Sequence, residues 1–153
     1  MTDRELMTAA IEQACLAAEE GEVPVGAVIA RNGEIIARGR NRREKNRNAL
    51  CHGEIEAINN ACEALNSWRL SDCVMYVTLE PCAMCAGAAI NARLKRVVFG
   101  AYDLKAGSFG SLTDLSVLPY NHKPEIQAGF MEEKCAELLT EFFRKIRGNE
   151  RSL

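Results

Sequence analysis

The chain of 153 residues has no long apolar run and almost no net charge. No stretch approaches the roughly 20 consecutive apolar residues that a membrane-spanning helix needs, so we expect no transmembrane segment and no membrane partner. Residues 1–5 are mostly polar or charged and no apolar block follows them, which argues against a signal peptide. Because 19 Lys and Arg are balanced by 21 Asp and Glu, the net charge of -2 favours no particular class of partner.

Composition and length are those of a globular protein. Hydrophobic residues make up 48% of the chain and charged residues 26%, which is ordinary for such proteins. The length suffices for one domain with a substantial core, which we place over residues 1–153. The seven cysteines are an odd number, and Cys82 and Cys85 form a close C-x-x-C pair. Without an export signal we expect reduced thiols in a cytoplasmic protein, and the close pair favours metal binding over a disulfide.

The basic residues are clustered although the net charge is small. One cluster lies between residues 38 and 47, where Glu44 is the single acidic residue, and a second lies near the C-terminus. Such clusters can bind phosphate groups. The alternative is a solvated loop and a basic helix end, where cations suit the helix dipole. The clusters comprise Arg38, Arg40, Arg42, Arg43, Lys45 and Arg47, and Arg144, Lys145, Arg147 and Arg151.

Periodicity predicts nine elements in the order α-β-β-α-β-α-β-β-α. Apolar residues recur at helical spacing near the start, and Asn32-Gly33 is a strong hairpin signal between the first two strands. Helices are predicted over 3–20, 52–64, 83–91 and 131–147, ending near Gly148; strands over 25–30, 34–40, 74–79, 96–100 and 125–128; and connections over 41–48 and 102–124. A hairpin joined to strand–helix–strand crossovers predicts an α/β fold, a three-layer α-β-α sandwich around a mixed five-stranded sheet.

Four residues concentrate the chemistry: His52 and Glu54, and the later pair Cys82 and Cys85. One imidazole and two thiols can hold a zinc ion, and three protein ligands leave a fourth position for water, as in catalytic rather than structural sites. Glu54 is not needed as a ligand and can carry protons beside the metal. The order H-x-E…P-C-x-x-C is the known signature of zinc deaminases that act on nucleobases. The alternative is a structural zinc site, or free core cysteines beside a helix-capping glutamate.

The spacing of these residues predicts where they lie. Residues i and i+2 do not face one another within a helix, so His52 and Glu54 can share a site only at the start of one. Pro81 likewise places Cys82 at the start of the next helix. Two helix N-termini would then meet at the site, and their positive ends favour thiolates. Cys51 could compete as a ligand, but we expect it to point away as a small buried residue.

Several segments together resemble the cytidine deaminase-like superfamily and, within it, the bacterial tRNA-specific adenosine deaminase family. The matching segments are residues 22–28, 76–88, 96–101, 110–112, 121–122 and 137–144. The resemblance implies hydrolytic deamination of adenosine to inosine at the wobble position of a tRNA anticodon, with release of ammonia. It also implies one Zn²⁺ per subunit, a tRNA anticodon stem-loop as partner, and a homodimer. Its metal ligands are His52, Cys82 and Cys85, and its catalytic proton carrier is Glu54.

The resemblance also implies three substrate-binding residues. Asn41 falls where the family uses an asparagine to hydrogen-bond the flipped base, although a plain strand-ending asparagine is the alternative. Asp103 and Asn121 lie on segments that line the family's nucleic-acid groove, although both residue types are also common in turns. Residues 142–143 are two phenylalanines that we expect in the core, although the family's C-terminal helix contacts RNA.

The chain departs from the family just before and within the first metal-ligand motif. The family usually reads Asp-Pro-x-x-His-Ala-Glu, whereas this chain has Asn48, Ala49 and Gly53 at the corresponding positions. Gly53 still lets the backbone approach a base closely. Two competing hypotheses are a deaminase of a free nucleobase or nucleoside, of the guanine or cytosine type, and a non-catalytic zinc-stabilised nucleic-acid-binding module. The basic loop and the long 102–124 connection favour a polymer over a free base, and Glu54 argues against the module.

Overall fold

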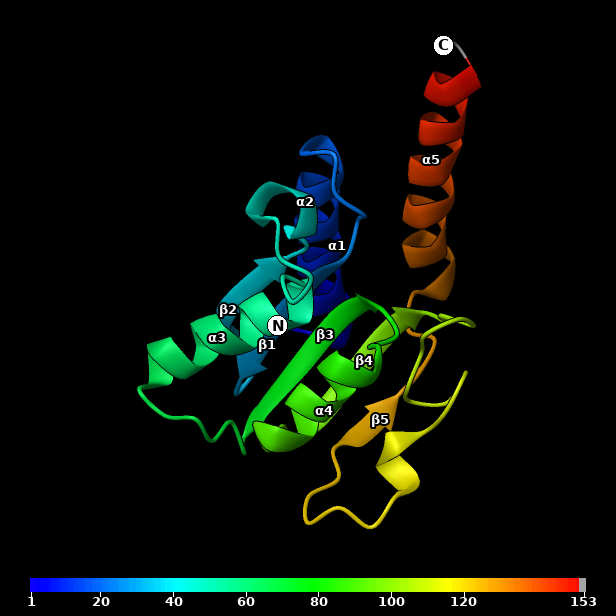
Figure 1. Ribbon diagram of the computed structural model, residues 1–153. Helices are drawn as coiled ribbons and strands as arrows, with labels where there is room; N and C mark the ends of the chain where they lie inside the picture. The colour runs from blue at the N-terminus through cyan, green and yellow to red at the C-terminus, as the bar shows by residue number, and fades with distance from the viewer. Residues whose placement is uncertain (152–153) are drawn as a thin grey trace.

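A mixed sheet of five strands lies between two layers of helices (Figure 1). The computed structural model describes the backbone of residues 1–151 and the side chains of residues 1–149. The helices are α1 (Asp3–Glu19), α2 (Arg43–Asn46), α3 (Gly53–Leu65), α4 (Ala83–Asn91) and α5 (Glu132–Arg151), with a short 3-10 turn, η1 (Leu115–Val117). The strands are β1 (Gly26–Arg31), β2 (Glu34–Arg40), β3 (Cys73–Leu79), β4 (Arg96–Ala101) and β5 (Glu125–Gln127). This is the predicted three-layer α-β-α architecture.

The topology of the sheet brings the starts of two helices together. The strand order is β2-β1-β3-β4-β5. β1 pairs antiparallel with both β2 and β3, whereas β3, β4 and β5 are parallel. The hairpin between β1 and β2 turns at Asn32 and Gly33, whose φ angles of 52° and 75° suit the predicted tight turn. Because β2 and β3 are each antiparallel to β1, they run in the same direction. The segments that lead to α3 and α4 therefore leave the sheet at the same end of the strands.

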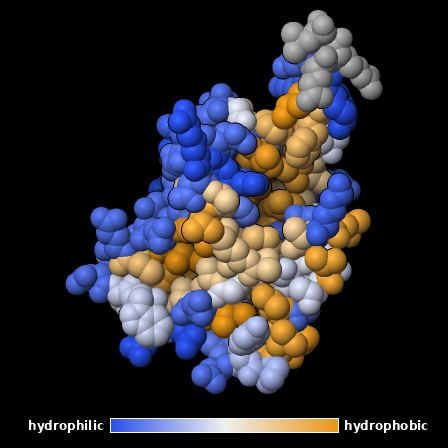
Figure 2. Space-filling view, in the orientation of Figure 1, coloured by the Kyte–Doolittle hydropathy of each residue, from blue (hydrophilic) through white to orange (hydrophobic). Residues whose placement is uncertain are grey.

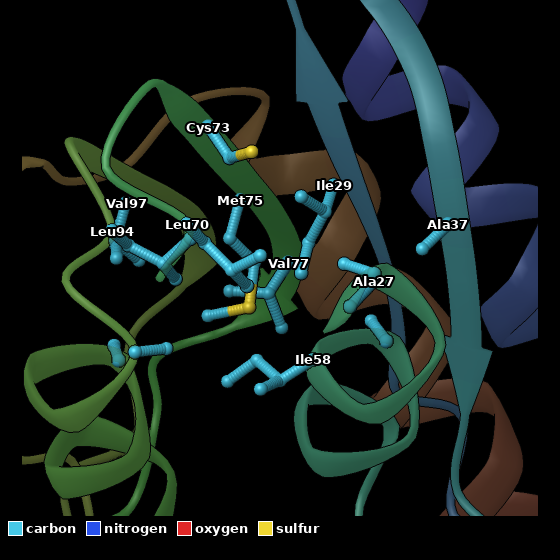
Figure 3. Close-up of a cluster of buried hydrophobic side chains, with 14 of the residues drawn as sticks. Ala27, Ile29, Ala37, Ile58, Leu70, Cys73, Met75, Val77, Leu94 and Val97 are labelled. Carbon is cyan, nitrogen blue, oxygen red and sulfur yellow. The ribbon is translucent and has the colours of Figure 1, made fainter. Parts of the chain in front are cut away.

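Each face of the sheet buries its own core. Alternate residues of a strand point to opposite faces. Ala27 and Ile29 of β1 therefore pack in the core with α3 and α4, whereas Val28 packs in the core with α1 and α5. Met75 and Val77 of β3 extend the first of these cores (Figure 3). Burial of such side chains contributes about 1.5–3 kcal/mol each, which holds both helical layers to the sheet.

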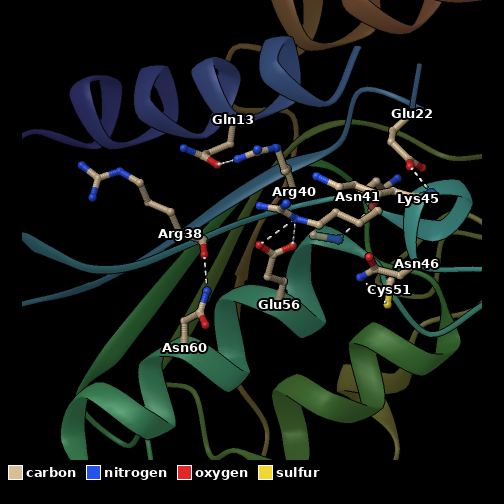
Figure 4. A network of polar contacts seen from close by, with 12 residues as sticks. Gln13, Glu22, Arg38, Arg40, Asn41, Lys45, Asn46, Cys51, Glu56 and Asn60 are labelled. Atoms are coloured by element: carbon tan, nitrogen blue, oxygen red, sulfur yellow. Dashed lines mark hydrogen bonds and ion pairs between the residues drawn. The ribbon is translucent and has the colours of Figure 1, made fainter. Parts of the chain in front are cut away.

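Residues 41–48, predicted as a polar loop, contain the short helix α2. The buried carboxylate of Glu22 accepts the backbone N–H groups of Glu44 at 3.1 Å and Lys45 at 2.8 Å (Figure 4). These bonds satisfy donors that the first turn of a helix leaves free. The helix ends at Arg47, which has a left-handed conformation with φ of 49°. Periodicity cannot be read over a helix of four residues. The helix also depends on the carboxylate of Glu22, which lies in a distant part of the chain.

The last helix is longer than predicted. α5 continues through Gly148 to Arg151 instead of ending near Gly148. A glycine inside an exposed helix costs only about 1 kcal/mol, so it need not end the helix. The first part of α5 packs on the sheet through Cys135 and Leu139, whereas its later turns project away from the sheet (Figure 1). Within the part of the chain that the structure describes, no helix has the length and apolar character needed to cross a membrane.

Candidate active site

His52 and Cys82 are the N-cap residues of α3 and α4, the two helix starts predicted from the sequence. Neither side chain makes a capping hydrogen bond, so both are free to face the same point in space. The Nδ1 atom of His52 lies 3.7 Å from the Sγ atom of Cys82 and 3.5 Å from the Sγ atom of Cys85. All three ligand atoms lie within 4.8 Å of one another. The two distant segments therefore form one cluster.

This cluster fits a metal ion held by three protein ligands. In a tetrahedral zinc site, Zn–N and Zn–S bonds of about 2.0 and 2.3 Å separate neighbouring ligand atoms by roughly 3.5–3.8 Å. The observed separations of 3.5 and 3.7 Å from His52 match this range. Among the residues that the structure describes, no fourth His, Cys, Asp or Glu joins the group. The chemistry of the ligand set therefore suits a catalytic metal ion rather than a closed structural one.

The two thiols of the cluster differ in their affinity for protons. The hydrogen bond from Cys85 lowers the pKa of the Cys82 thiol to about 3, and a hydrogen bond from His52 acts in the same direction. The pKa of Cys85 is raised, because its proton is shared with Cys82 and because the side chain is buried. The hydrogen bond to Cys82 raises the pKa of His52. Cys82 and Cys85 therefore share a proton between the ligand atoms, where a cation could replace it.

Glu54 is the buried acid of the site. It lies in the first turn of α3, lines the same cavity as His52 and Cys82, and is 3% exposed. Its Oε1 atom has no hydrogen-bond partner among the described residues. Burial raises the pKa of the Glu54 carboxyl to about 7, and the opposing effects of a backbone N–H and of His52 are smaller. A buried carboxyl with one oxygen left without a partner is costly, which indicates a group kept for chemistry rather than for stability.

Close packing of β2 against the start of α3 fixes His52 and Glu54 in place. A Cβ atom at Gly39 would lie 2.3 Å from the carbonyl oxygen of Gly53, so a larger residue could not be accommodated there without a shift. Asn41, which is buried, accepts the N–H of Gly53 at 2.8 Å through its Oδ1 atom. The amide nitrogen of Asn41 has no protein partner among the described residues, and the side chain lines the cavity. It is therefore available to donate a hydrogen bond to a bound molecule.

The cluster opens into a cavity of about 510 Å³. Arg43 of α2 lies on one side of it, and Leu139 and Phe143 of α5 lie on the other. Figure 2 shows this hollow between the hydrophilic residues over α2 and the apolar flank of α5. A cation opposite apolar and aromatic side chains suits a ligand that joins a flat ring to a negatively charged group. Phe143, expected in the core, is instead 43% exposed at this cavity.

Asp103, the second predicted substrate residue, also lines the cavity. Its Oδ1 atom accepts the N–H groups of Lys105 at 3.1 Å and Ala106 at 3.2 Å. The residue therefore closes a turn, which was the alternative interpretation, at the same time as it faces the site. These contacts leave its role toward a substrate as a prediction.

Asn121, the third predicted substrate residue, is exposed and does not line this cavity. Its neighbour His122 hydrogen-bonds through Nε2 to the carbonyl oxygen of Leu94 at 2.6 Å. Leu94 lies just before the start of β4, whereas Cys82 lies just after the end of the parallel strand β3. This contact is therefore at the opposite end of the strands from Cys82. The structure of a single chain therefore does not bring Asn121 to the metal ligands.

Cys51 is not part of the cluster, as expected, but it is half-buried rather than buried. Its Sγ atom accepts a hydrogen bond from the side-chain amide of Asn46 at 3.6 Å (Figure 4). It lines a separate cavity with Arg42 and Glu56. Its position next to His52 in the sequence therefore does not make it a ligand.

Sequence reasoning missed two residues at the cavity, Arg43 and Glu80. Arg43 belongs to the basic cluster, but the sequence does not tell which of its cations are neutralised. The structure pairs Arg40 with Glu20, Arg42 with Glu56, and Lys45 with Glu20. Arg43 makes no ion pair within the described part of the chain, so it is the cation of this cluster that is free at the cavity. Glu80 lies two residues before Cys82 in the motif, and its neighbours in sequence give no sign of its role.

Several known proteins of similar sequence and structure are deaminases. A model of the MafB19-like deaminase family matches residues 1–147. The tRNA-specific adenosine deaminase of Bacillus subtilis (strain 168) is 47% identical over 99% of this chain and 96% of its own. A solved structure from a study of A-to-I editing by tRNA:A34 deaminases at the wobble position has a TM-score of 0.85, with 41% identity over 89% of this chain and 99% of that one.

A more distant match is to an enzyme with a different substrate. The crystal structure of guanine deaminase from Bacillus subtilis has a TM-score of 0.66 and is 31% identical over 97% of this chain and 95% of that one. The higher identity to the tRNA-specific enzymes agrees with the resemblance of the zinc motifs. The chain therefore belongs to the tRNA-specific adenosine deaminase family of the cytidine deaminase-like superfamily.

Proposed function

We propose that this protein converts adenosine to inosine at the wobble position of a tRNA anticodon. The observation that carries this proposal is the cluster of His52, Cys82 and Cys85 beside the buried Glu54, whose Oε1 atom has no hydrogen-bond partner among the described residues. We propose zinc as the metal, because two thiolates and one imidazole are a common set of zinc ligands. A non-catalytic zinc-stabilised module would gain nothing from a buried acid beside an open cluster.

The reaction replaces the amino group of adenine by oxygen. Zinc held by the cluster would supply Lewis acidity, which makes water nucleophilic near neutral pH. Glu54 accepts a proton from the water as its oxygen bonds to the ring carbon, and delivers that proton to the neighbouring ring nitrogen. The second water proton goes to the amino group, so the C–N bond breaks and ammonia leaves. Burial raises the pKa of the Glu54 carboxyl, which makes its carboxylate a better proton acceptor.

A base in an anticodon loop must leave the stack to reach this site. The amide nitrogen of Asn41 supports recognition of the base, since it faces the cavity without a protein partner. Arg43 supports contact with a phosphate, and Phe143 offers an aromatic surface near the opening. Asn41 lies just after β2, Arg43 in α2 and Phe143 in α5, so the cavity can contact the base and the RNA backbone together.

Ammonia release from a panel of substrates tests the proposed function. We expect inosine to form in an anticodon stem-loop with adenosine at the wobble position. No product is expected from a matched stem-loop with guanosine there, or from free adenosine, guanine or cytosine. Activity on guanine alone would contradict the proposal. It would favour the free-base hypothesis, which the likeness to guanine deaminase and the unusual Asn48 and Gly53 support.

Two substitutions of Asn41 separate its two hydrogen-bonding roles. Asn41→Asp keeps an acceptor for the N–H of Gly53 but loses the free amide donor. We expect it to lose about 10-fold or more in kcat/KM, as for a lost hydrogen bond to substrate. Asn41→Ala should show a similar kinetic loss and should also unfold with about 1–2 kcal/mol less free energy, because the Gly53 N–H loses its partner. Kinetics and chemical denaturation of both variants measure this, and unchanged kcat/KM in Asn41→Asp would contradict it.

We also propose that residues 1–153 act as one deaminase domain within a cytoplasmic homodimer. A tRNA substrate supports the cytoplasmic location. Leu112, Val117 and Leu118 are exposed apolar residues in the long connection and support contact between two copies of the chain. Light scattering should give twice the chain mass of 16.9 kDa, and a monomer at micromolar concentration would contradict the dimer.

A further inference from the structure

We propose that Glu80 is a positioning residue that holds residues 103–111 as the wall over which the RNA enters the active site. This inference rests on the proposed RNA deamination. Glu80 immediately precedes Pro81-Cys82 and is only 1% exposed. A carboxylate buried this deeply is stabilised only if donors surround it. The reaction proposed above does not use this group, so its donors indicate its role.

One segment supplies the hydrogen-bond donors to the side chain of Glu80. Its Oε1 atom accepts the N–H of Asp103 at 3.1 Å and the hydroxyl of Ser111 at 2.5 Å. Its Oε2 atom accepts the N–H groups of Phe109 at 3.2 Å and Ser111 at 3.0 Å. Both oxygens are therefore occupied, and the first and last donors span the whole segment. A connection that would otherwise be long and irregular is fixed at its two ends by a single side chain.

Gly107 allows the segment to close over this carboxylate. A Cβ atom at Gly107 would lie 2.3 Å from the Cδ atom of Glu80 and 2.4 Å from the carbonyl oxygen of Asp103. The next residue, Ser108, donates its N–H to the carbonyl oxygen of Pro81 at 2.9 Å. The segment is therefore attached to the same strand end that leads into Cys82. Its position relative to the metal ligands is set by these contacts.

The segment held by Glu80 forms part of the cavity wall through Leu104, Lys105 and Ala106. Leu104 is 79% exposed and Lys105 is also exposed, so both lie toward the opening of the cavity. A free base at the metal ligands would not need an apolar and a cationic side chain there. A polymer that crosses the opening contacts both. The order imposed by Glu80 should therefore act on RNA binding rather than on the chemical step.

Glu80→Gln tests this role, because glutamine keeps the size of the side chain but turns an NH₂ group toward N–H donors. We expect KM for the anticodon stem-loop to rise about 10-fold, kcat to stay within about threefold, and metal content to stay at one per chain. Hydrogen exchange should become at least about 10-fold faster at the amides of Asp103, Phe109 and Ser111, with α4 unchanged.

Ser111→Ala is a milder variant that removes only the hydroxyl donor to Glu80. It should raise KM and the exchange rates in the same direction but by less. This variant tests the proposal if Glu80→Gln does not fold.

Val98→Ala is the matched control for lost stability. Val98 is buried on the face of the sheet under α1 and α5, so its truncation should lower the thermal midpoint and leave KM unchanged. Faster exchange in Glu80→Gln with unchanged KM would overturn the proposal, and so would loss of metal or a fall in kcat alone. A wild-type protein that does not deaminate the stem-loop would refute the proposed function and the RNA wall together. Hydrogen exchange would then still decide whether Glu80 orders the segment.

Discussion

Glu54→Gln is expected to lower kcat for RNA deamination by about 10²–10⁴-fold and to leave the fold and the metal content unchanged. Glutamine matches glutamate in size but cannot accept and release a proton at pH 7. Because the carboxyl is buried and its Oε1 atom is unpartnered, loss of the charge should keep or slightly raise the thermal midpoint. Steady-state kinetics, metal analysis and thermal unfolding of the same preparation measure the three quantities.

Glu56→Gln is the matched control for this substitution. Glu56 lies two residues later in α3, but it pairs with Arg42 at 3.0 Å and does not line the active-site cavity. We expect its kcat to stay within about twofold, because Glu56 does not reach the active-site cavity. Retained turnover in Glu54→Gln would refute the proposed mechanism. Loss of metal in Glu54→Gln would show that the carboxylate is a ligand instead.

Cys85→Ala is expected to abolish both metal binding and activity. Two remaining protein ligands hold zinc far less tightly than three, so metal per chain should fall from one to below about 0.1 after dialysis. Turnover should fall by at least about 10³-fold, because the remaining residues cannot activate water without the metal. His52→Ala and Cys82→Ala should behave in the same way, since all three ligand atoms lie within 4.8 Å of one another. Elemental analysis and kinetics measure the two effects.

Cys51→Ala distinguishes ligands from neighbouring thiols. Cys51 is adjacent to His52 in the sequence but bonds to Asn46 and lines a different cavity. We expect this variant to keep one metal per chain and wild-type turnover. Loss of metal in Cys51→Ala would mean that the ligand set is wrong, and full metal content in Cys85→Ala would mean the same.

The sheet and the cluster of His52, Cys82 and Cys85 could be predicted from the sequence because the signals of their elements are local. Asn32 and Gly33 adopt the backbone conformation that their hairpin signal implies. The spacing between His52 and Glu54 is a local signal for a helix start. Pro81 gives the same kind of signal for Cys82. Once the strand order brings the two helix starts to the same end of the strands, the cluster follows.

Features that depend on distant partners could not be predicted in this way. Helix α2 forms because Glu22 accepts its N–H groups, and the pairing of Arg42 with Glu56 is visible only in three dimensions. The role of Glu80 is hidden for the same reason, because its donors come from residues 103–111. The assignment of Asn121 to the substrate stays a prediction, since it depends on a bound molecule or a second subunit.

The strand order also determines how the protein avoids self-association through its sheet. β2 and β5 are the two edge strands, where unpaired backbone groups can recruit strands from other molecules and begin aggregation. β5 has only three residues, so it offers a short template. β2 is longer, but it carries the exposed charges of Glu34 and Arg38, and its pairing with β1 is interrupted by a register shift beside Ile29. Neither edge is therefore long, regular and uncharged, which protects the folded chain from growth into fibrils.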